Sequence, residues 1–147
     1  MLLLSVFLTH TILSLFSLSL FLKTVGTVTY SENGITQETY TGDWVDGKMS
    51  GRGRYNYKDG SIYEGEWLTG KMDGQGKFLF SNGNEYNGAW VDDYKCGYGT
   101  LLYSSGERYE GNWEEDKADG YGTLIYKNLD TYKGNWKADK KDGAGTY

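Results

Sequence analysis

The chain has 147 residues, of which 22 are glycine and none is proline; aromatic residues make up 16% and the formal net charge is −5. This length suits one domain, and glycines that do not recur every third residue exclude a collagen-like chain. The acidic balance argues against nucleic acid as a partner, because phosphate contacts need clustered basic side chains.

Residues 1–23 form a hydrophobic N-terminal segment whose first 22 residues carry no charge. As a helix of about 33 Å, residues 1–22 could span a hydrocarbon core of about 30 Å. The segment predicts a signal anchor, with Lys23 at the boundary and the rest of the chain on the cytoplasmic side. Alternatives are a secretory signal peptide, a helix folded onto the sheet, and a wrongly assigned start of the coding region. We expect a membrane-associated protein, or a cytosolic one if the segment is not an anchor.

Residues 24–39 predict an irregular half-repeat that caps the array. The stretch 26–30, Gly-Thr-Val-Thr-Tyr, resembles 99–103, Gly-Thr-Leu-Leu-Tyr. Gly34 lies six residues before Tyr40, whereas the corresponding turn glycines later in the chain lie three residues before their tyrosines. Terminal repeats are often atypical in this way.

The motif Tyr-x-Gly-x-Trp begins every 23 residues from Tyr40, and a Gly-x-Gly pair follows each copy at a fixed distance. The recurring aromatic residues are Tyr40, Trp44, Tyr63, Trp67, Tyr86, Trp90, Tyr109, Trp113, Tyr132 and Trp136. Spacing without insertion or deletion predicts a stack of identical units, so 40–147 is interpreted as five repeats, the last incomplete. Because the chain stops within a predicted strand, we also consider a truncated product or an edge that pairs with something else.

Each repeat alternates between large and polar residues with the two-residue period of a strand, as Tyr63, Gly65 and Trp67 do. Two strands and two turns per repeat predict an elongated, single-layer antiparallel sheet that advances about 10 Å per repeat. Glycines inside strands normally destabilise them. If Gly65, Gly74 and Gly76 share the tyrosine face, each leaves a slot for a ring, and the ten rings form a structural ladder.

The turns carry residues that tolerate positive φ. Three residues after each tryptophan the sequence has glycine twice and then aspartate three times, which should keep the turn shape. The other turn has Asp59-Gly60 in the first repeat but Asn128-Leu129 in the fourth. Because leucine rarely adopts positive φ, we expect a distorted or mobile turn at Leu129.

No catalytic or metal-binding constellation is apparent. The single histidine, His10, lies in the apolar segment, and Gly97-Tyr-Gly99 lacks the third glycine of a dinucleotide loop. The acidic run 114–120 lacks calcium-loop spacing. The single cysteine, Cys96, allows no internal disulfide and has no basic partner in the sequence pattern. We expect no cofactor, no metal, no small-molecule substrate and no enzyme activity.

Two sets of surface residues are candidate contacts on the face opposite the rings or near the ends. A broken apolar row that would suit a protein partner comprises Ile62, Leu68, Leu79, Val91, Leu102 and Ile125. Basic residues that would suit anionic phospholipid are Arg52, Arg54, Lys58, Lys133, Lys137, Lys140 and Lys141.

The pattern Tyr-x-Gly-x-Trp-x-x-Gly-Lys-x-x-Gly-x-Gly, complete at 40–53 and 63–76, resembles the MORN-repeat family. The resemblance implies a meander of β-hairpins and a scaffold or interaction module. In the family such repeats occur in membrane-bridging junctophilins, plant phosphatidylinositol phosphate kinases, cytoskeletal proteins and a lysine methyltransferase. Later copies depart from the pattern, with aspartate at the turn glycine and Tyr94 at the usual lysine.

Three functional hypotheses follow. The first is a non-enzymatic repeat scaffold that binds a protein partner, tethered at a membrane by residues 1–22. The second is a regulatory fragment of a larger enzyme such as a phosphatidylinositol phosphate kinase. The third is an anionic phospholipid-binding module.

Overall fold

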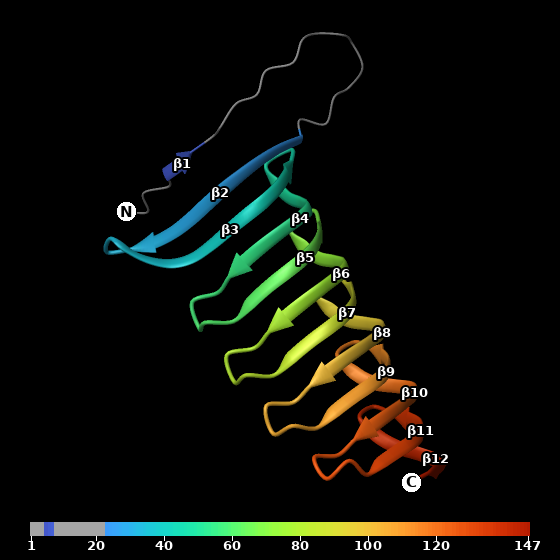
Figure 1. Cartoon of the computed structure of the whole chain (residues 1–147). Helices are drawn as coiled ribbons and strands as arrows, with labels where there is room; N and C mark the ends of the chain where they lie inside the picture. The colour runs from blue at the N-terminus through green and yellow to red at the C-terminus, as the bar shows by residue number, and fades with distance from the viewer. Residues whose placement is uncertain (1–4, 8–22) are drawn as a thin grey trace, which may run out of the picture.

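A computed structural model of the chain describes residues 5–7 and 23–147. They form one antiparallel sheet in which each strand pairs with the strands that precede and follow it in sequence. Figure 1 shows a ribbon one layer thick, with hairpin turns along both long edges and the C-terminal strands at the end farthest from β2. The predicted all-β single-layer meander is therefore confirmed, and β2 to β12 make up its body.

The strands of the described residues follow one another at short intervals. They are β1 (Ser5–Phe7), β2 (Lys23–Glu32), β3 (Ile35–Val45), β4 (Lys48–Asn56), β5 (Ile62–Leu68), β6 (Lys71–Leu79), β7 (Glu85–Val91), β8 (Tyr94–Leu102), β9 (Arg108–Glu114), β10 (Lys117–Ile125), β11 (Thr131–Lys137) and β12 (Lys140–Thr146).

The predicted N-terminal helix is wrong where the structure describes that segment. Ser5–Phe7 forms β1, which pairs antiparallel with residues 27–29 of β2. The backbone of an edge strand offers unpaired donors and acceptors, to which another strand can bind. The rest of the segment, 1–4 and 8–22, lies outside the described residues. In the described part of the chain, no helix has the length and apolar character needed to cross a membrane.

Strand β2 and the start of β3 occupy the place of a preceding half-repeat. Gly26 pairs with Gly42, and the Gly26 carbonyl accepts a hydrogen bond from Trp44 Nε1 at 3.3 Å. The same bond recurs between repeats farther along the chain. The turn that joins β2 to β3 has positive φ at Asn33 and Gly34, and the register shifts between Tyr30 and Ser31.

The turn inside each repeat has positive φ at both central residues, as at Thr69 (50°) and Gly70 (92°). This is the geometry of a type I′ hairpin, whose twist matches that of the strands. Asp93, Asp116 and Asp139 keep the geometry with φ of 75°, 69° and 66°, as predicted. Asp93 also does more than glycine can: its Oδ1 accepts the Met72 backbone N–H at 2.8 Å, which joins neighbouring turns.

The expected distortion at Leu129 is wrong. Leu129 has a φ of 71° and its N–H donates to the Tyr126 carbonyl at 2.9 Å, as Gly106 N–H does to the Tyr103 carbonyl. Asn128 Oδ1 accepts the Asp130 N–H at 3.1 Å, which further holds the turn. The neighbouring strands and these bonds impose the turn shape on leucine, so the misfit is stored as backbone strain rather than relieved by a new conformation.

The two positions of each Gly-x-Gly pair require glycine for different structural reasons. Within a repeat, 73–75 of β6 stand opposite the single residue Glu66 of β5, so β6 bulges there. Gly74 lies in that bulge with a φ of 106°, and a Cβ on it would meet Glu66. The prediction that Gly74 makes room for a ring is therefore wrong: glycine is needed there because the backbone of this bulge has a positive φ at Gly74.

The second glycine of the pair does make room for a ring. Gly76 pairs directly with Gly65, and a Cβ on either would overlap the Tyr63 ring, which lies over both. The Tyr63 hydroxyl donates to the Glu66 carbonyl at 3.0 Å, so the buried phenol keeps a hydrogen bond. Corresponding glycine pairs and rings recur in every repeat.

Tryptophans join each repeat to the one before it. Trp90 Nε1 donates to the Gly76 carbonyl at 3.2 Å, and the Trp90 ring meets the Tyr63 ring edge to face at a centroid distance of 5.5 Å. Trp67 meets Tyr63 from the other side at 5.1 Å. Each ring buries about 150–250 Å² at about 25 cal/mol per Å², so this packing stabilises each repeat by several kcal/mol.

Replacement of Gly76 by alanine tests the contact between ring and glycine. We expect Gly76→Ala to lower the free energy of unfolding by about 3 kcal/mol, because its Cβ would overlap the Tyr63 ring. Chemical denaturation followed by tryptophan fluorescence measures this. Lys77→Ala is the matched control on the opposite face and should change stability by less than about 0.5 kcal/mol. Equal effects of the two substitutions would contradict the packing.

Replacement of Leu129 by glycine tests the strained turn. We expect Leu129→Gly to raise the free energy of unfolding by about 1 kcal/mol, because glycine adopts a φ of 71° without a Cβ clash. Gly106→Leu, the reverse change one repeat earlier, should lower stability by a similar amount. A stability loss in Leu129→Gly, measured by the same denaturation, would show that the turn is unstrained.

Candidate functional site

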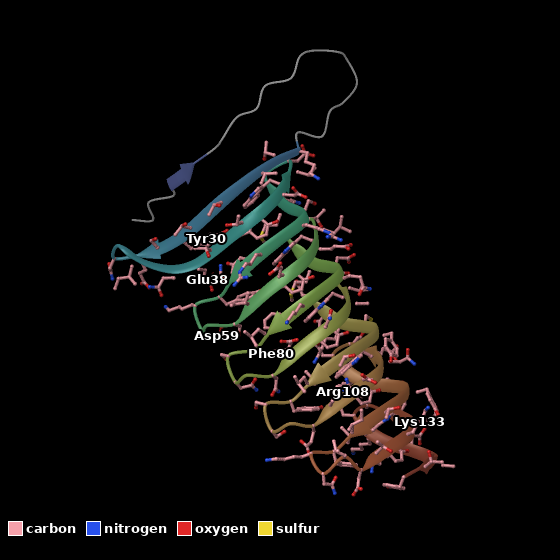
Figure 2. All side chains as sticks on the ribbon, viewed as in Figure 1. Tyr30, Glu38, Asp59, Phe80, Arg108 and Lys133 are labelled. Carbon is pink, nitrogen blue, oxygen red and sulfur yellow. The ribbon has the colours of Figure 1, made fainter. Side chains whose placement is uncertain are left out.

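The two faces of the sheet differ in every repeat. Side chains project from both faces of the ribbon along its whole length (Figure 2). We call the face that holds the tyrosine and tryptophan rings the aromatic face, and the opposite one the polar face. Alternation along each strand assigns Tyr63 and Trp67 to the aromatic face and Glu64 and Glu66 to the polar face.

The predicted ladder residues lie together on the aromatic face. All five tyrosines are buried, with Tyr40, Tyr63 and Tyr86 at 0% exposure, and the tryptophans after Trp44 are at most 8% exposed. Trp44, next to the half-repeat, is partly buried and packs against this cluster. These rings fill the core, so the ladder is a structural element whose own rings are largely buried.

Further rows of the aromatic face were missed in the sequence. One row has Tyr55, Phe78, Leu101 and Leu124 at 23-residue intervals, all buried or packed against the cluster. Another has Met49, Met72, Lys95, Ala118 and Lys141 opposite the five tryptophans. The first row could have been found in the sequence, because each of its residues stands two positions after the second glycine of a Gly-x-Gly pair. The second could not, because its residues share no chemical character.

Burial raises the pKa of most aromatic-face tyrosines. The pKa of Tyr109 rises to about 12, mainly because its phenol is buried and also because Asp139 is near. Burial raises the pKa of Tyr63 further, and Glu66 adds to the effect. A phenolate would lose hydration without gaining a cation there, so the neutral form is stabilised.

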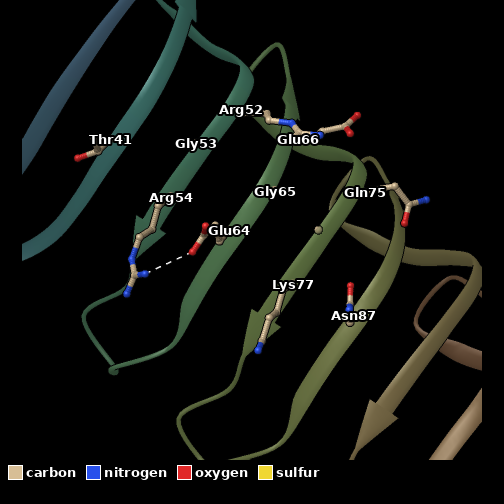
Figure 3. A pocket seen from close by; sticks show the side chains of 11 residues that line it. Thr41, Arg52, Gly53, Arg54, Glu64, Gly65, Glu66, Gln75, Lys77 and Asn87 are labelled. Carbon is tan, nitrogen blue, oxygen red and sulfur yellow. Dashed lines mark hydrogen bonds and ion pairs between the residues drawn. The ribbon is translucent and has the colours of Figure 1, made fainter.

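The polar face is hollowed beside β4 to β7. A hollow of about 500 Å³ is lined by charged and amide side chains that stand on both sides of a row of glycines (Figure 3). Arg54 pairs with Glu64 at 3.3 Å on one side. Arg52 lies across the strand pair from Glu66 on the other. Opposite charges therefore alternate along the hollow, and it has no dominant sign.

The predicted apolar row is two separate groups on the polar face. Ile62 pairs with Leu79, and Glu85 and Arg108 connect these in register to Leu102 and Ile125. We call the set Ile62, Leu79, Leu102 and Ile125 the aliphatic row. Leu68 and Val91 instead lie at the other ends of their strands, beside the type I′ turns. The predicted broken row thus has its gap along the strands, because strand alternation fixes a face but not a position along the strand.

Acidic neighbours offset several of the predicted lipid-binding cations. Lys58 Nζ lies 3.9 Å from a Glu32 oxygen, and Lys137 Nζ lies 3.3 Å from one of Asp119. Lys141 Nζ lies over the Tyr132 ring, 4.3 Å from its centroid. Arg52, Lys133 and Lys140 are exposed, but Arg52 lies on β4, whereas Lys133 and Lys140 lie on the paired strands β11 and β12. The structure therefore does not gather the seven residues into one basic surface.

Within residues 5–7 and 23–147, no three His, Cys, Asp or Glu side chains converge as metal ligands would. Cys96 is partly buried with a free thiol. No buried side-chain nitrogen or oxygen of the described residues lacks a hydrogen-bond partner.

The geometry defines an elongated repeat protein built from single-layer β-hairpins with a glycine-backed aromatic core. The sequence matches the MORN repeat at residues 40–62, 63–85, 86–108, 109–131 and 132–147, which cover most of the chain. The chain therefore belongs to the MORN-repeat family, as its motif predicted. A search of curated proteins gives no match. MORN repeats are generally interaction or scaffold modules and are not catalytic by themselves.

High pH should destabilise the sheet through its tyrosines. Above the usual tyrosine value of 10.0, unfolded chains lose phenolic protons while Tyr109, with a pKa of about 12, retains its own. The native state then binds more protons, so the free energy of unfolding should fall by at least about 2 kcal/mol between pH 10 and 12. Burial lowers the pKa of Lys95, which acts in the opposite direction but for a single group.

Denaturation at a series of pH values, with tyrosinate absorbance recorded in parallel, measures this effect. The tyrosinate absorbance of Tyr40, Tyr63, Tyr86 and Tyr109, whose pKa values burial raises, should appear together with unfolding and not before it. Ionisation of all tyrosines near pH 10 in a chain that remains folded would contradict their burial.

Proposed function

We propose that the protein is a non-enzymatic scaffold that binds a protein partner on its polar face. The observation that carries this proposal is the division between the faces. The ladder rings of the aromatic face form the core of the sheet, whereas Leu79 and Leu102 on the polar face are 37% and 45% exposed. The family assignment supports a scaffold or interaction role in general.

The aliphatic row provides the apolar part of the proposed interface. Its residues come from β5, β6, β8 and β10, so one partner segment that lies along the ribbon can contact several repeats. Glu85, which pairs with Lys77 at 2.9 Å, and Arg108, which pairs with Glu110 at 3.1 Å, stand in or beside the row. An apolar centre with charged neighbours is the usual composition of a protein interface.

Photo-crosslinking in cells tests this function. With a photoreactive amino acid at Leu102, we expect one discrete protein adduct, and the same amino acid at exposed Leu129 in a turn should give none. Adding Leu79→Glu to the Leu102 probe should remove the adduct, because a charge would then be buried at the interface. Equal labelling from both probe positions, or an adduct unaffected by Leu79→Glu, would contradict the proposal.

Membrane association and lipid binding stay predictions. Co-sedimentation of the chain with phosphatidylserine vesicles tests them. The ion pairs of Arg54, Lys58 and Lys137 support a protein partner over lipid, because their charges are already offset. Two results together would favour the lipid-binding function instead: the chain sediments with the vesicles in a salt-sensitive way, and neutralisation of Arg52, Lys133 and Lys140 abolishes this sedimentation.

A further inference from the structure

One position of the aromatic face changes its residue from repeat to repeat. It lies directly opposite the tryptophan of its own repeat, and we call it the slot position. Its residues are Met49, Met72, Lys95, Ala118 and Lys141. In the third and fourth repeats the tryptophan of the following repeat lies beside the slot: Trp113 beside Lys95 and Trp136 beside Ala118.

Lys95 shows that this slot accepts an alkylammonium group. Its Nζ lies 4.6 Å from the centroid of the Trp113 ring, 5.7 Å from that of Tyr86 and 5.9 Å from that of Phe80. It also lies 3.9 Å from Asp116 Oδ1, and the Lys95 side chain is only 14% exposed. Ring faces and a carboxylate together attract a cation and compensate part of its lost hydration.

One repeat later, Ala118 leaves the slot unfilled. A cavity of about 400 Å³ lies there, lined among others by Trp136, Tyr109, Tyr103 and Asp139. Each of these stands 23 residues after a residue that surrounds the Lys95 ammonium. The cavity thus reproduces the surroundings of Lys95 without the lysine side chain. Its lining also includes Leu101 and Leu124, where the first two repeats carry the larger Tyr55 and Phe78.

The charge around this cavity favours a cation. The charged residues in its lining are Lys95, Asp116 and Asp139, and Lys95 is already paired with Asp116. The surrounding repeat, 109–131, carries six acidic and two basic side chains, a formal charge of −4. Asp139 also receives the Ala118 N–H at 2.8 Å, so its carboxylate is fixed at the cavity.

We propose that the Ala118 cavity binds a lysine side chain of a protein partner, in the position that Lys95 occupies from within the chain one repeat earlier. The inference rests on the proposed scaffold function and adds a second contact surface to it, because the cavity lies on the aromatic face and the aliphatic row on the polar face. The alkyl stem contacts the leucines and rings, and the ammonium lies near the Trp136 ring and the Asp139 carboxylate. The neighbouring slots are filled by Lys95 and Lys141, so the cavity selects one place along the ribbon.

Titration of the full chain with Nα-acetyl-lysine methylamide, followed by the Trp136 indole N–H resonance, tests this proposal. We expect a saturable shift. The capped norleucine analogue has the same shape at its stem but no charge, and it should bind about tenfold more weakly. No saturable shift with the lysine probe, or equal binding of the norleucine probe, would overturn the proposal.

Two variants make the test specific. Ala118→Met restores the residue of the first two repeats and should abolish binding of the lysine probe while the sheet remains folded. Asp139→Asn removes the carboxylate charge but keeps an oxygen for the Ala118 N–H and a residue that tolerates positive φ. It should weaken binding about tenfold. Unchanged binding in folded Ala118→Met protein would contradict the assignment.

Failure of this inference can be told from failure of the proposed function. The cavity lies on the aromatic face and the aliphatic row on the polar face, so the Leu102 crosslink reports on a different surface. A crosslink that persists while the lysine probe fails to bind overturns only the lysine site. Loss of both would overturn the scaffold function as well.

Discussion

The tyrosine ring that lies over two facing glycines is the contact on which the rest of the sheet depends. A sheet normally buries its apolar face against a second layer, but here Tyr63 covers the backbone of Gly65 and Gly76 instead. Trp67 and Trp90 close the ring from two sides. Because Trp90 belongs to the next repeat, part of the core contact of Tyr63 is shared between neighbours. The core therefore grows along the ribbon, and each repeat depends on the next one.

This arrangement separates stability from recognition. The aromatic face supplies the core, so substitutions there change the free energy of unfolding, whereas the polar face can vary with little effect on the fold. The slot position is where the two roles meet. Methionine fills it in the first two repeats and lysine in the third, but Ala118 leaves a cavity with the same ring and carboxylate neighbours. The small side chain of Ala118 thus leaves the cavity for which we propose a lysine ligand.

The spacing of the motif predicted the sheet, its meander order and the burial of the rings, because a two-residue period and a 23-residue repeat constrain the backbone strongly. The sequence could not separate the roles of Gly74 and Gly76, since the bulge at 73–75 depends on pairing across the hairpin. Nor could it position Leu68 apart from Leu79, because alternation assigns a face but not a row. The Ala118 cavity exists because the small alanine side chain leaves space beside Trp136. No motif in the sequence indicates that space. For Leu129 the residue preference was real, but the surrounding hydrogen bonds prevailed over it.

The ring currents of the tyrosines provide the most direct measurement of the central contact. A tyrosine ring that lies flat over a glycine shields the glycine Hα protons, so NMR spectra of the folded chain should show the Hα resonances of Gly65 and Gly76 well upfield of their unfolded values. In the Tyr63→Leu variant these Hα resonances should return to their unfolded values. The Hα resonances of Gly88, which lies under Tyr86, should stay shifted. Unshifted Hα resonances at Gly65 and Gly76 in the folded protein would contradict the account.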